Sequence, residues 1–129
     1  MTPDAVEGLA ILLWASEPEA PHRLGAPFFH AAAAAAMDLR VEIYFSARSV
    51  LLLKTGVAQA LRASTAHDKT ALDAMREAVS HGAQLLACSD AMNAHDVAAE
   101  HLIAECAGRG GAVQFIAQAC DPAWRTLVF

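Results

Sequence analysis

The sequence predicts a three-layer α/β protein (helix–sheet–helix) in which a mostly parallel sheet lies between two layers of helices. Apolar segments of strand length alternate along the whole chain with segments of helical character. The connections between successive strand segments are long enough for the crossovers that parallel pairing requires. The first strand segment, residues 8–14, is a continuous apolar run, which is typical of a strand that is covered on both faces.

The other strand segments are short and rich in apolar side chains. Residues 41–45 combine β-branched and aromatic side chains with a two-residue alternation, and residues 84–87 end directly before Cys88. The last strand segment covers residues 125–129 and ends in three apolar side chains, for which we expect burial. The sequence therefore predicts four strands.

The helical segments carry recognisable start and stop signals. Six consecutive alanines at residues 31–36 favour a helix over residues 27–37. Thr70, followed three residues later by Asp73, has the form of a capping box and predicts a helix that ends near Gly82. The remaining helical predictions are a short helix capped by Ser46 that runs to residue 54, a helix over residues 98–106 and a helix over residues 113–119.

Length and composition limit the class of protein. The 129 residues suffice for one domain with its own core, and we expect a single domain over residues 1–129. The net charge is −5 without a basic cluster, which argues against a nucleic-acid partner. The apolar runs are shorter than the roughly 18 residues of a spanning helix, so no membrane partner is predicted. The N-terminus has no cationic region, so no signal peptide is predicted.

The cysteine content indicates a reduced, cytoplasmic protein. The three cysteines are odd in number and form no CxxC motif, so they do not predict a disulfide framework. Cys106 and Cys120 lie in apolar segments of helical character, and we expect both to pack as core residues.

Cys88 is the residue that points to chemistry. It ends a predicted strand, and the carboxyl end of a strand is where α/β proteins gather their ligand-binding loops. Ser89 or Asp90 would cap the following helix, whose amide groups would then face the sulfur. A thiol at such a helix start ionises more easily, and the thiolate is the reactive form. The alternative is a buried cysteine that packs as a small hydrophobic side chain.

Several other motifs fail on spacing. The stretch Gly-Arg-Gly-Gly at residues 108–111 is not the dinucleotide fingerprint, because Val113 stands where its last glycine is required. We expect it to end one helix and begin another. A thiol phosphatase would need an arginine six residues after Cys88, and Ala94 stands there.

Two histidines are possible neighbours of the thiol. His95 and His101 follow Cys88 closely enough for a Cys–His nucleophile pair, although solvated helix faces are the alternative place for both. With Glu100 they do not show the four-residue spacing of ligands that share a helix face. We therefore predict no metal site.

Several segments taken together carry a family resemblance. They are residues 9–14, 41–45 and 50–54, Ala87-Cys88-Ser89 with Met92, and residues 101–103, 110–112 and 126–129. In their order and spacing, over nearly the whole chain, they resemble the DsrE-like family of sulfur-relay proteins, which includes the TusD-type subunits.

The resemblance implies a flavodoxin-like subunit that assembles into oligomers. In active members the cysteine after the third strand accepts sulfur as a persulfide and passes it to a partner protein, and Cys88 occupies that position. We accordingly expect donor and acceptor proteins as partners, no cofactor, and a homo-oligomer, either a trimer or a hexamer. The 56% of hydrophobic residues agrees with surface covered by other subunits. Two alternatives remain open, namely a non-catalytic oligomeric module that binds a small ligand with Cys88 structural, and a redox sensor in which Cys88 is oxidised.

Overall fold

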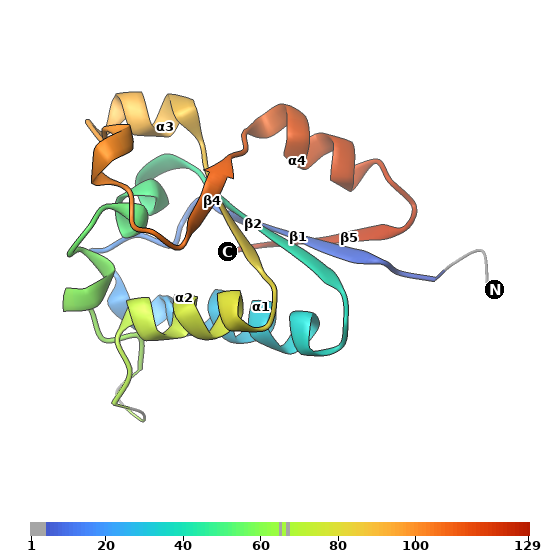
Figure 1. The fold of residues 1–129 in the computed structure, drawn as a ribbon, viewed down its shortest axis with the longest axis horizontal. Helices are drawn as coiled ribbons and strands as arrows, with labels where there is room; N and C mark the ends of the chain where they lie inside the picture. The colour runs from blue at the N-terminus through green and yellow to red at the C-terminus, as the bar shows by residue number, and fades with distance from the viewer. Residues whose placement is uncertain (1–4, 65, 67) are drawn as a thin grey trace.

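The computed structural model describes residues 5–64, 66 and 68–129, and strands and helices alternate along this part of the chain (Figure 1). The strands are β1 (Gly8–Leu13), β2 (Arg40–Phe45), β3 (Gln84–Ala87), β4 (Cys106–Arg109) and β5 (Trp124–Val128). The α-helices are α1 (Gly25–Ala36), α2 (Ala71–Ser80), α3 (Ser89–Ala94) and α4 (Ala112–Ala119). Short 3₁₀ helices are η1 (Pro21–Arg23), η2 (Ala47–Leu53), η3 (Ala58–Ala60) and η4 (Ala99–His101). None of the described helices is both long and apolar enough to cross a membrane.

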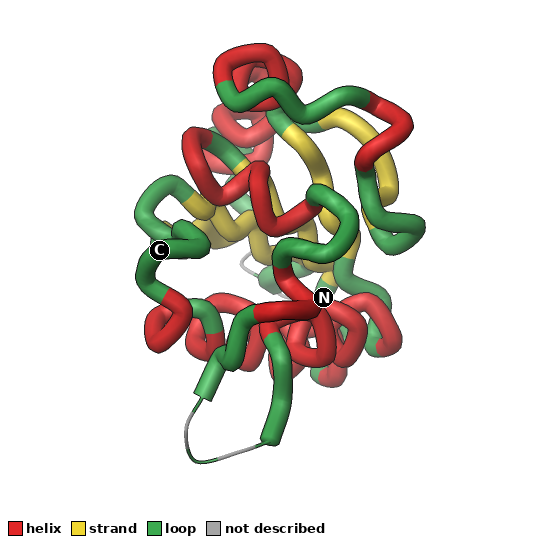
Figure 2. Tube along the Cα trace, turned by 90° about the vertical axis from the view of Figure 1, so that its left-hand side faces the viewer, coloured by secondary structure: helices red, strands yellow, loops and turns green. Residues whose placement is uncertain are grey.

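The five strands form one parallel sheet in the order β4-β3-β2-β1-β5. β1 lies inside the sheet, with β2 on one side and β5 on the other. Helices lie below and above the strands when the molecule is seen from the side (Figure 2). This arrangement confirms the predicted three-layer α/β fold. Because all strands are parallel, their carboxyl ends meet at one edge of the sheet.

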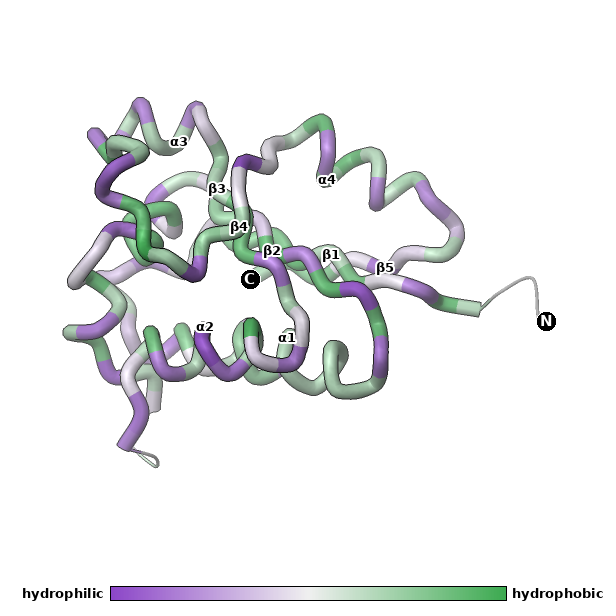
Figure 3. The backbone as a smooth tube through the Cα atoms, in the orientation of Figure 1, coloured by the Kyte–Doolittle hydropathy of each residue, from purple (hydrophilic) through white to green (hydrophobic). Residues whose placement is uncertain are grey.

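The main core lies between the sheet and the layer formed by α1 and α2 (Figure 1). Alternate residues of β1 and β2 point into it, including Ile11, Ile43 and Phe45, which are all fully buried. The Phe28 ring of α1 stacks on Phe45 with ring centroids 6.0 Å apart. The alanines of α1 allow this close approach, and α1 is coloured as hydrophobic along most of its length in Figure 3.

The opposite face of the sheet has a much smaller core. It consists of Ala10, Tyr44, Leu86 and Trp124, with Phe115 of α4 packed against them. No residue of α4 is fully buried, whereas α1 and α2 each bury several. The three layers are therefore uneven, and a single amphipathic helix covers this side of the central strands.

The prediction of a helix over residues 98–106 is wrong in its second half. Only η4 is helical there, and Cys106 begins the edge strand β4 instead of ending a helix. Its sequence, Cys-Ala-Gly-Arg, has no β-branched residue, so the strand exists because its backbone pairs with β3. The pairing contains a bulge opposite Leu85 and Leu86.

The terminal strand exists, but its predicted burial is wrong. β5 is an edge strand, and Leu127 and Val128 are 38% and 57% exposed. Phe129 follows it, is half-buried and donates its backbone N–H to the Leu12 carbonyl. Cys120 is exposed at the end of α4, so it does not pack in the core as predicted, and Cys106 is half-buried.

The helix prediction from Thr70 is confirmed in detail. The Thr70 hydroxyl accepts the Asp73 N–H, the Asp73 carboxylate accepts the Thr70 N–H, and the second of these bonds lowers the pKa of Asp73. The loop predicted before it, residues 63–69, is closed by an antiparallel bridge between Arg62 and Thr70, and its residues 65 and 67 lie outside the described part of the chain.

Candidate functional site

Cys88 follows β3 directly and is fixed at the carboxyl edge of the sheet. Its N–H donates to the Phe45 carbonyl of the neighbouring strand at 3.1 Å, and its carbonyl accepts the Met92 N–H at 3.0 Å. Cys88 is therefore itself the residue that caps α3, and the prediction that Ser89 or Asp90 would be the cap is wrong. Those two residues form the first turn of α3 and are exposed. The thiol is half-buried.

The alternation of strand side chains explains what the thiol faces. Leu12, Tyr44 and Leu86 stand side by side in register on the α4 face of the sheet. Side chains two residues apart share a face, so Ser46 and Cys88 continue the rows that begin at Tyr44 and Leu86. Side chains from β1, β2 and β3 therefore lie together just beyond the carboxyl edge of the sheet.

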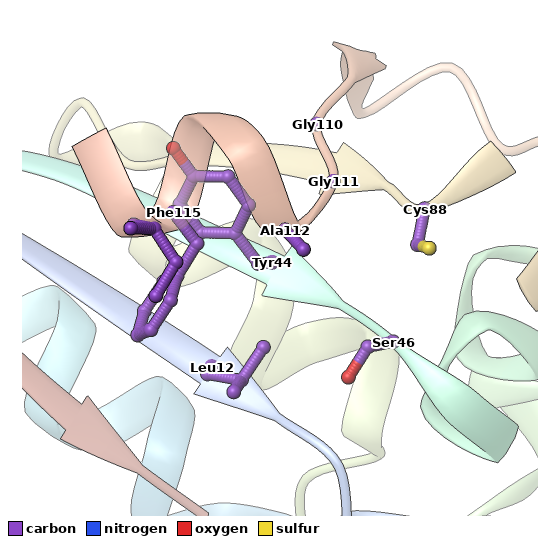
Figure 4. A pocket seen from close by; sticks show the side chains of 9 residues that line it. Leu12, Tyr44, Ser46, Cys88, Gly110, Gly111, Ala112 and Phe115 are labelled. Carbon is purple, nitrogen blue, oxygen red and sulfur yellow. The ribbon is translucent and has the colours of Figure 1, made fainter. Parts of the chain in front are cut away.

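A cavity of about 310 Å³ lies at that place (Figure 4). The Tyr44 and Phe115 rings form one side of it and meet edge to face with centroids 5.4 Å apart. Cys88 lies at the other side, past Ser46. The remaining lining residues are Leu12, Gly110, Gly111, Ala112 and Ile116.

The glycine-rich stretch connects β4 to α4 and forms one wall of this cavity. The prediction that it separates two helices is therefore wrong. The Gly110 N–H donates to the Ala87 carbonyl at 3.0 Å, which ties the loop to the residue before Cys88. A Cβ at position 110 would lie 2.9 Å from Leu86 Cβ and 3.0 Å from a Tyr44 ring carbon, so this position requires glycine by close approach.

A second cavity, of about 620 Å³, shares the glycine loop with the first as part of its wall. Cys88 lines both cavities, as do residues 110–112. Ser89, Asp90 and Arg109 line only the second one, so it is the more polar of the two. Cys88 therefore borders both an apolar cavity and a wider, more open one with some polar side chains.

A buried polar network holds α4 above the sheet. Glu42 is 6% exposed, and its Oε1 accepts the Tyr44 hydroxyl at 2.7 Å and the Gln118 Nε2 at 2.9 Å. Burial, together with the bond to the Glu42 carboxylate, raises the pKa of Tyr44. The phenol is thus a fixed donor to Glu42, and only the Tyr44 ring is presented to the cavity.

The turn after β2 is held by two serines. Ser46 Oγ donates to the Leu13 carbonyl at 2.7 Å, and the buried Ser49 Oγ lies 2.6 Å from the Ser46 carbonyl. Ser46 therefore stands at the N-cap position of η2 as predicted, but its side chain bonds to the neighbouring strand and not to the helix. Ala47, which follows, has φ = 50°, a left-handed conformation that alanine adopts at a cost. This strained turn places Ser46 at the cavity.

The two predicted histidine neighbours lie elsewhere. His95 is half-buried at the carboxyl end of α3, whereas Cys88 precedes the start of that helix. His101 is exposed in η4, and its carbonyl accepts the N–H and the hydroxyl of Thr55. Neither lines a cavity that Cys88 lines. No group of three His, Cys, Asp or Glu side chains among the described residues is arranged to hold a metal ion.

The fold and the site define a class of protein. It is a small parallel α/β domain with one cysteine at the carboxyl edge of its sheet, and that cysteine borders two cavities. The model of the DsrE/DsrF-like family matches residues 10–129, and the chain belongs to this family. The family is generally associated with sulfur relay and with partner proteins. A comparison with curated proteins found no match.

Sequence reasoning found the thiol but not its surroundings. The residues it missed are Leu12, Tyr44, Ser46, Gly110, Gly111, Ala112, Phe115 and Ile116. A usable signal existed for two of them, because Tyr44 and Ser46 stand at the end of a strand in the same alternation as Leu86 and Cys88. The glycine loop was missed because β4 was predicted as a helix.

Proposed function

We propose that the protein is a sulfur carrier that accepts sulfane sulfur on Cys88 as a persulfide and passes it to a partner protein. The observation that carries the proposal is the position of Cys88 in a chain of the DsrE/DsrF-like family: a single cysteine at the carboxyl edge of the sheet, reachable from two cavities. Cys106 and Cys120 line neither cavity.

The two half-reactions balance without an oxidant, a metal or a cofactor. The Cys88 thiolate attacks the outer sulfur of a donor persulfide R–S–SH, the S–S bond of the donor breaks, and R–S⁻ leaves. The product is Cys88–S–SH, which keeps the donor's proton on the transferred sulfur. An acceptor thiolate then attacks that outer sulfur, and the Cys88 thiolate is the leaving group.

The surroundings of the thiol suit both steps. The hydrogen bonds of the Cys88 backbone to Phe45 and Met92 fix the position of its backbone, so the residue that carries the sulfur is in place before a donor binds. The apolar cavity offers space for a donor beside the sulfur. The wider cavity, with Ser89, Asp90 and Arg109, leaves an open approach for the acceptor.

Mass spectrometry after exposure to inorganic polysulfide tests the function. We expect one added sulfur atom on Cys88 and its transfer to an acceptor thiol added later. Cys88→Ser, with its fold checked by circular dichroism, should lose the adduct. An adduct that maps to Cys106 or Cys120 contradicts the assignment. A chain without any adduct favours the alternative in which Cys88 is structural.

We further propose that the carrier works in the cytoplasm, with donor and acceptor proteins as partners, as a homotrimer or homohexamer. Thiols stay reduced in that compartment, and the three cysteines are free in the structure. Large apolar side chains are exposed on several elements, among them Trp14, Met37, Val113 and Val128. Light scattering at micromolar concentration should give a multiple of three subunits, and a monomer mass would contradict this.

A further inference from the structure

We propose that the apolar cavity beside Cys88 binds the uncharged, apolar substituent of a small organic persulfide, so that Cys88 takes sulfur from donors of this class in preference to charged ones. The inference rests on the proposed sulfur-carrier function and adds to it the chemical class of the donor.

The chemistry of the cavity wall selects for apolar groups. Leu12, Phe115 and Ile116 contribute aliphatic and aromatic surface, and the Tyr44 ring adds to it. The described residues that line this cavity include no charged side chain. The hydroxyl protons of Tyr44 and Ser46 are both used inside the protein, since Tyr44 donates to Glu42 and Ser46 donates to the Leu13 carbonyl. A carboxylate or ammonium group placed among these side chains would lose its water without gaining an oppositely charged side chain as a partner.

The cavity is much larger than a bare sulfur atom needs. A cavity of about 150 Å³ with comparable walls is enough to hold benzene in another protein. The volume here is about 310 Å³, at the lower end of the range of small-molecule sites. It has room for a ring or a branched chain together with the atoms that join it to sulfur.

The position of the Cys88 thiol relative to the cavity determines how a bound donor presents its sulfur atoms. Cys88 lies at one side of the cavity and the Tyr44 and Phe115 rings at the other (Figure 4). A substituent that fills the space between the rings and Leu12 therefore leaves its persulfide sulfurs toward Cys88. After the transfer the thiolate R–S⁻ remains, and its new charge in an apolar site promotes release.

The test compares three sulfur donors on the intact protein: inorganic polysulfide, benzyl hydropersulfide and glutathione hydropersulfide. Polysulfide has no organic substituent and reports on the carrier function alone. The benzyl substituent of benzyl hydropersulfide is uncharged and apolar, whereas the substituent of glutathione hydropersulfide carries charged groups. The measured quantity is the second-order rate constant for adding one sulfur atom to Cys88, followed by quenched mass spectrometry. We expect the benzyl donor to react faster than the glutathione donor by a factor of about ten or more.

A matched pair of charge substitutions tests whether the preference comes from the cavity. Ile116 lines it and is 56% exposed, so Ile116→Lys adds a cation at the cavity without cutting into the core. Ala119→Lys adds the same charge on the same helix at an exposed position that lines neither cavity. We expect Ile116→Lys to lose the preference for the benzyl donor and Ala119→Lys to keep it.

A binding measurement separates the two proposals. Benzyl mercaptan is titrated into Cys88→Ser by calorimetry, which needs no sulfur transfer. In one outcome polysulfide modifies Cys88 while the two organic donors react equally fast, and in another the preference for the benzyl donor survives in Ile116→Lys. Either result overturns the proposed class of donor and leaves the carrier function standing. If polysulfide leaves Cys88 unmodified while Cys88→Ser binds benzyl mercaptan, the carrier function fails and the cavity is supported as a site for apolar molecules. If benzyl mercaptan does not bind, the cavity assignment is overturned.

Discussion

Adding a single methyl group at Gly110 tests the packing that builds the site. The Cβ of Gly110→Ala would lie 2.9 Å from Leu86 Cβ and 3.0 Å from Tyr44 Cε2, about 0.5 Å inside ordinary contact. Leu86 Cβ is fixed to the backbone of β3, which pairs on both sides, so it cannot yield by a side-chain rotation. The glycine loop must move instead, and the bond from the Gly110 N–H to the Ala87 carbonyl must lengthen.

We expect Gly110→Ala to lower the free energy of unfolding by about 2 kcal/mol, within the range for overpacking of a close contact. Gly111→Ala is the matched control, because a Cβ there would meet nothing within 4 Å and its φ of −117° suits alanine. Both substitutions restrict the unfolded chain equally, so that effect cancels in the comparison. Gly111 caps α4, where alanine is less favourable than glycine, and we expect its net change to stay below about 1 kcal/mol.

Equilibrium urea unfolding followed by circular dichroism measures the difference, with the m-value as a check on two-state behaviour. In thermal scans, about 2 kcal/mol corresponds to a decrease in Tm of roughly 6–10 °C for a chain of this size. The rate at which iodoacetamide alkylates Cys88 should change in Gly110→Ala and stay unchanged in Gly111→Ala. Equal stability of the two variants would refute the close-packing argument for this loop.

Three further substitutions or conditions test other parts of the fold. Tyr44 is the only tyrosine, and its pKa is raised by burial and by Glu42, so the folded state keeps a proton that the unfolded chain loses near pH 10. The free energy of unfolding should therefore be unchanged by this group below pH 10 and should fall by about 1.4 kcal/mol per pH unit above it. Tyrosinate absorbance that rises with pH while circular dichroism still shows a folded chain would contradict this. Thr70→Ala should cost about 1 kcal/mol in urea unfolding by removing the N-cap of α2, whereas Thr70→Ser should retain most of it. Gly8→Ala would place a Cβ 2.4 Å from the Trp124 ring and should cost about 1–3 kcal/mol, and an unchanged unfolding midpoint would show that the ring can move aside.

The part of the fold that could be predicted is the part decided by local pattern. β1, β2 and β3 are apolar runs between polar turns, and α2 has a capping box that is visible in the sequence and present in the structure. The strand β4 could not be predicted in this way. Residues 98–105 contain good helix formers, and the strand that follows is defined only by its pairing with β3, a contact between distant parts of the chain.

The site shows the same division. Cys88 could be located because it follows a strand with no intervening residue. Its neighbours could not, because Leu12, Tyr44 and Phe115 come from three other elements and meet only through the order of strands in the sheet. The buried Glu42 illustrates a further limit: a carboxylate in a strand with alternating pattern is expected to face water, and here α4 covers it and supplies Gln118 as a partner.

The uneven layering affects how the cavity exchanges its contents with solvent. The helix that closes it, α4, buries none of its own side chains completely and is anchored chiefly by the Phe115 ring and by Gln118. Segments with few buried contacts open locally at a lower free energy than the whole molecule unfolds. The amide protons of α4 should therefore exchange with deuterium before those of α1 and α2, which rest on the main core. Such openings uncover the Tyr44 ring and the cavity while the Cys88 backbone stays bonded to Phe45, so ligand entry can proceed without disturbing the position of the sulfur.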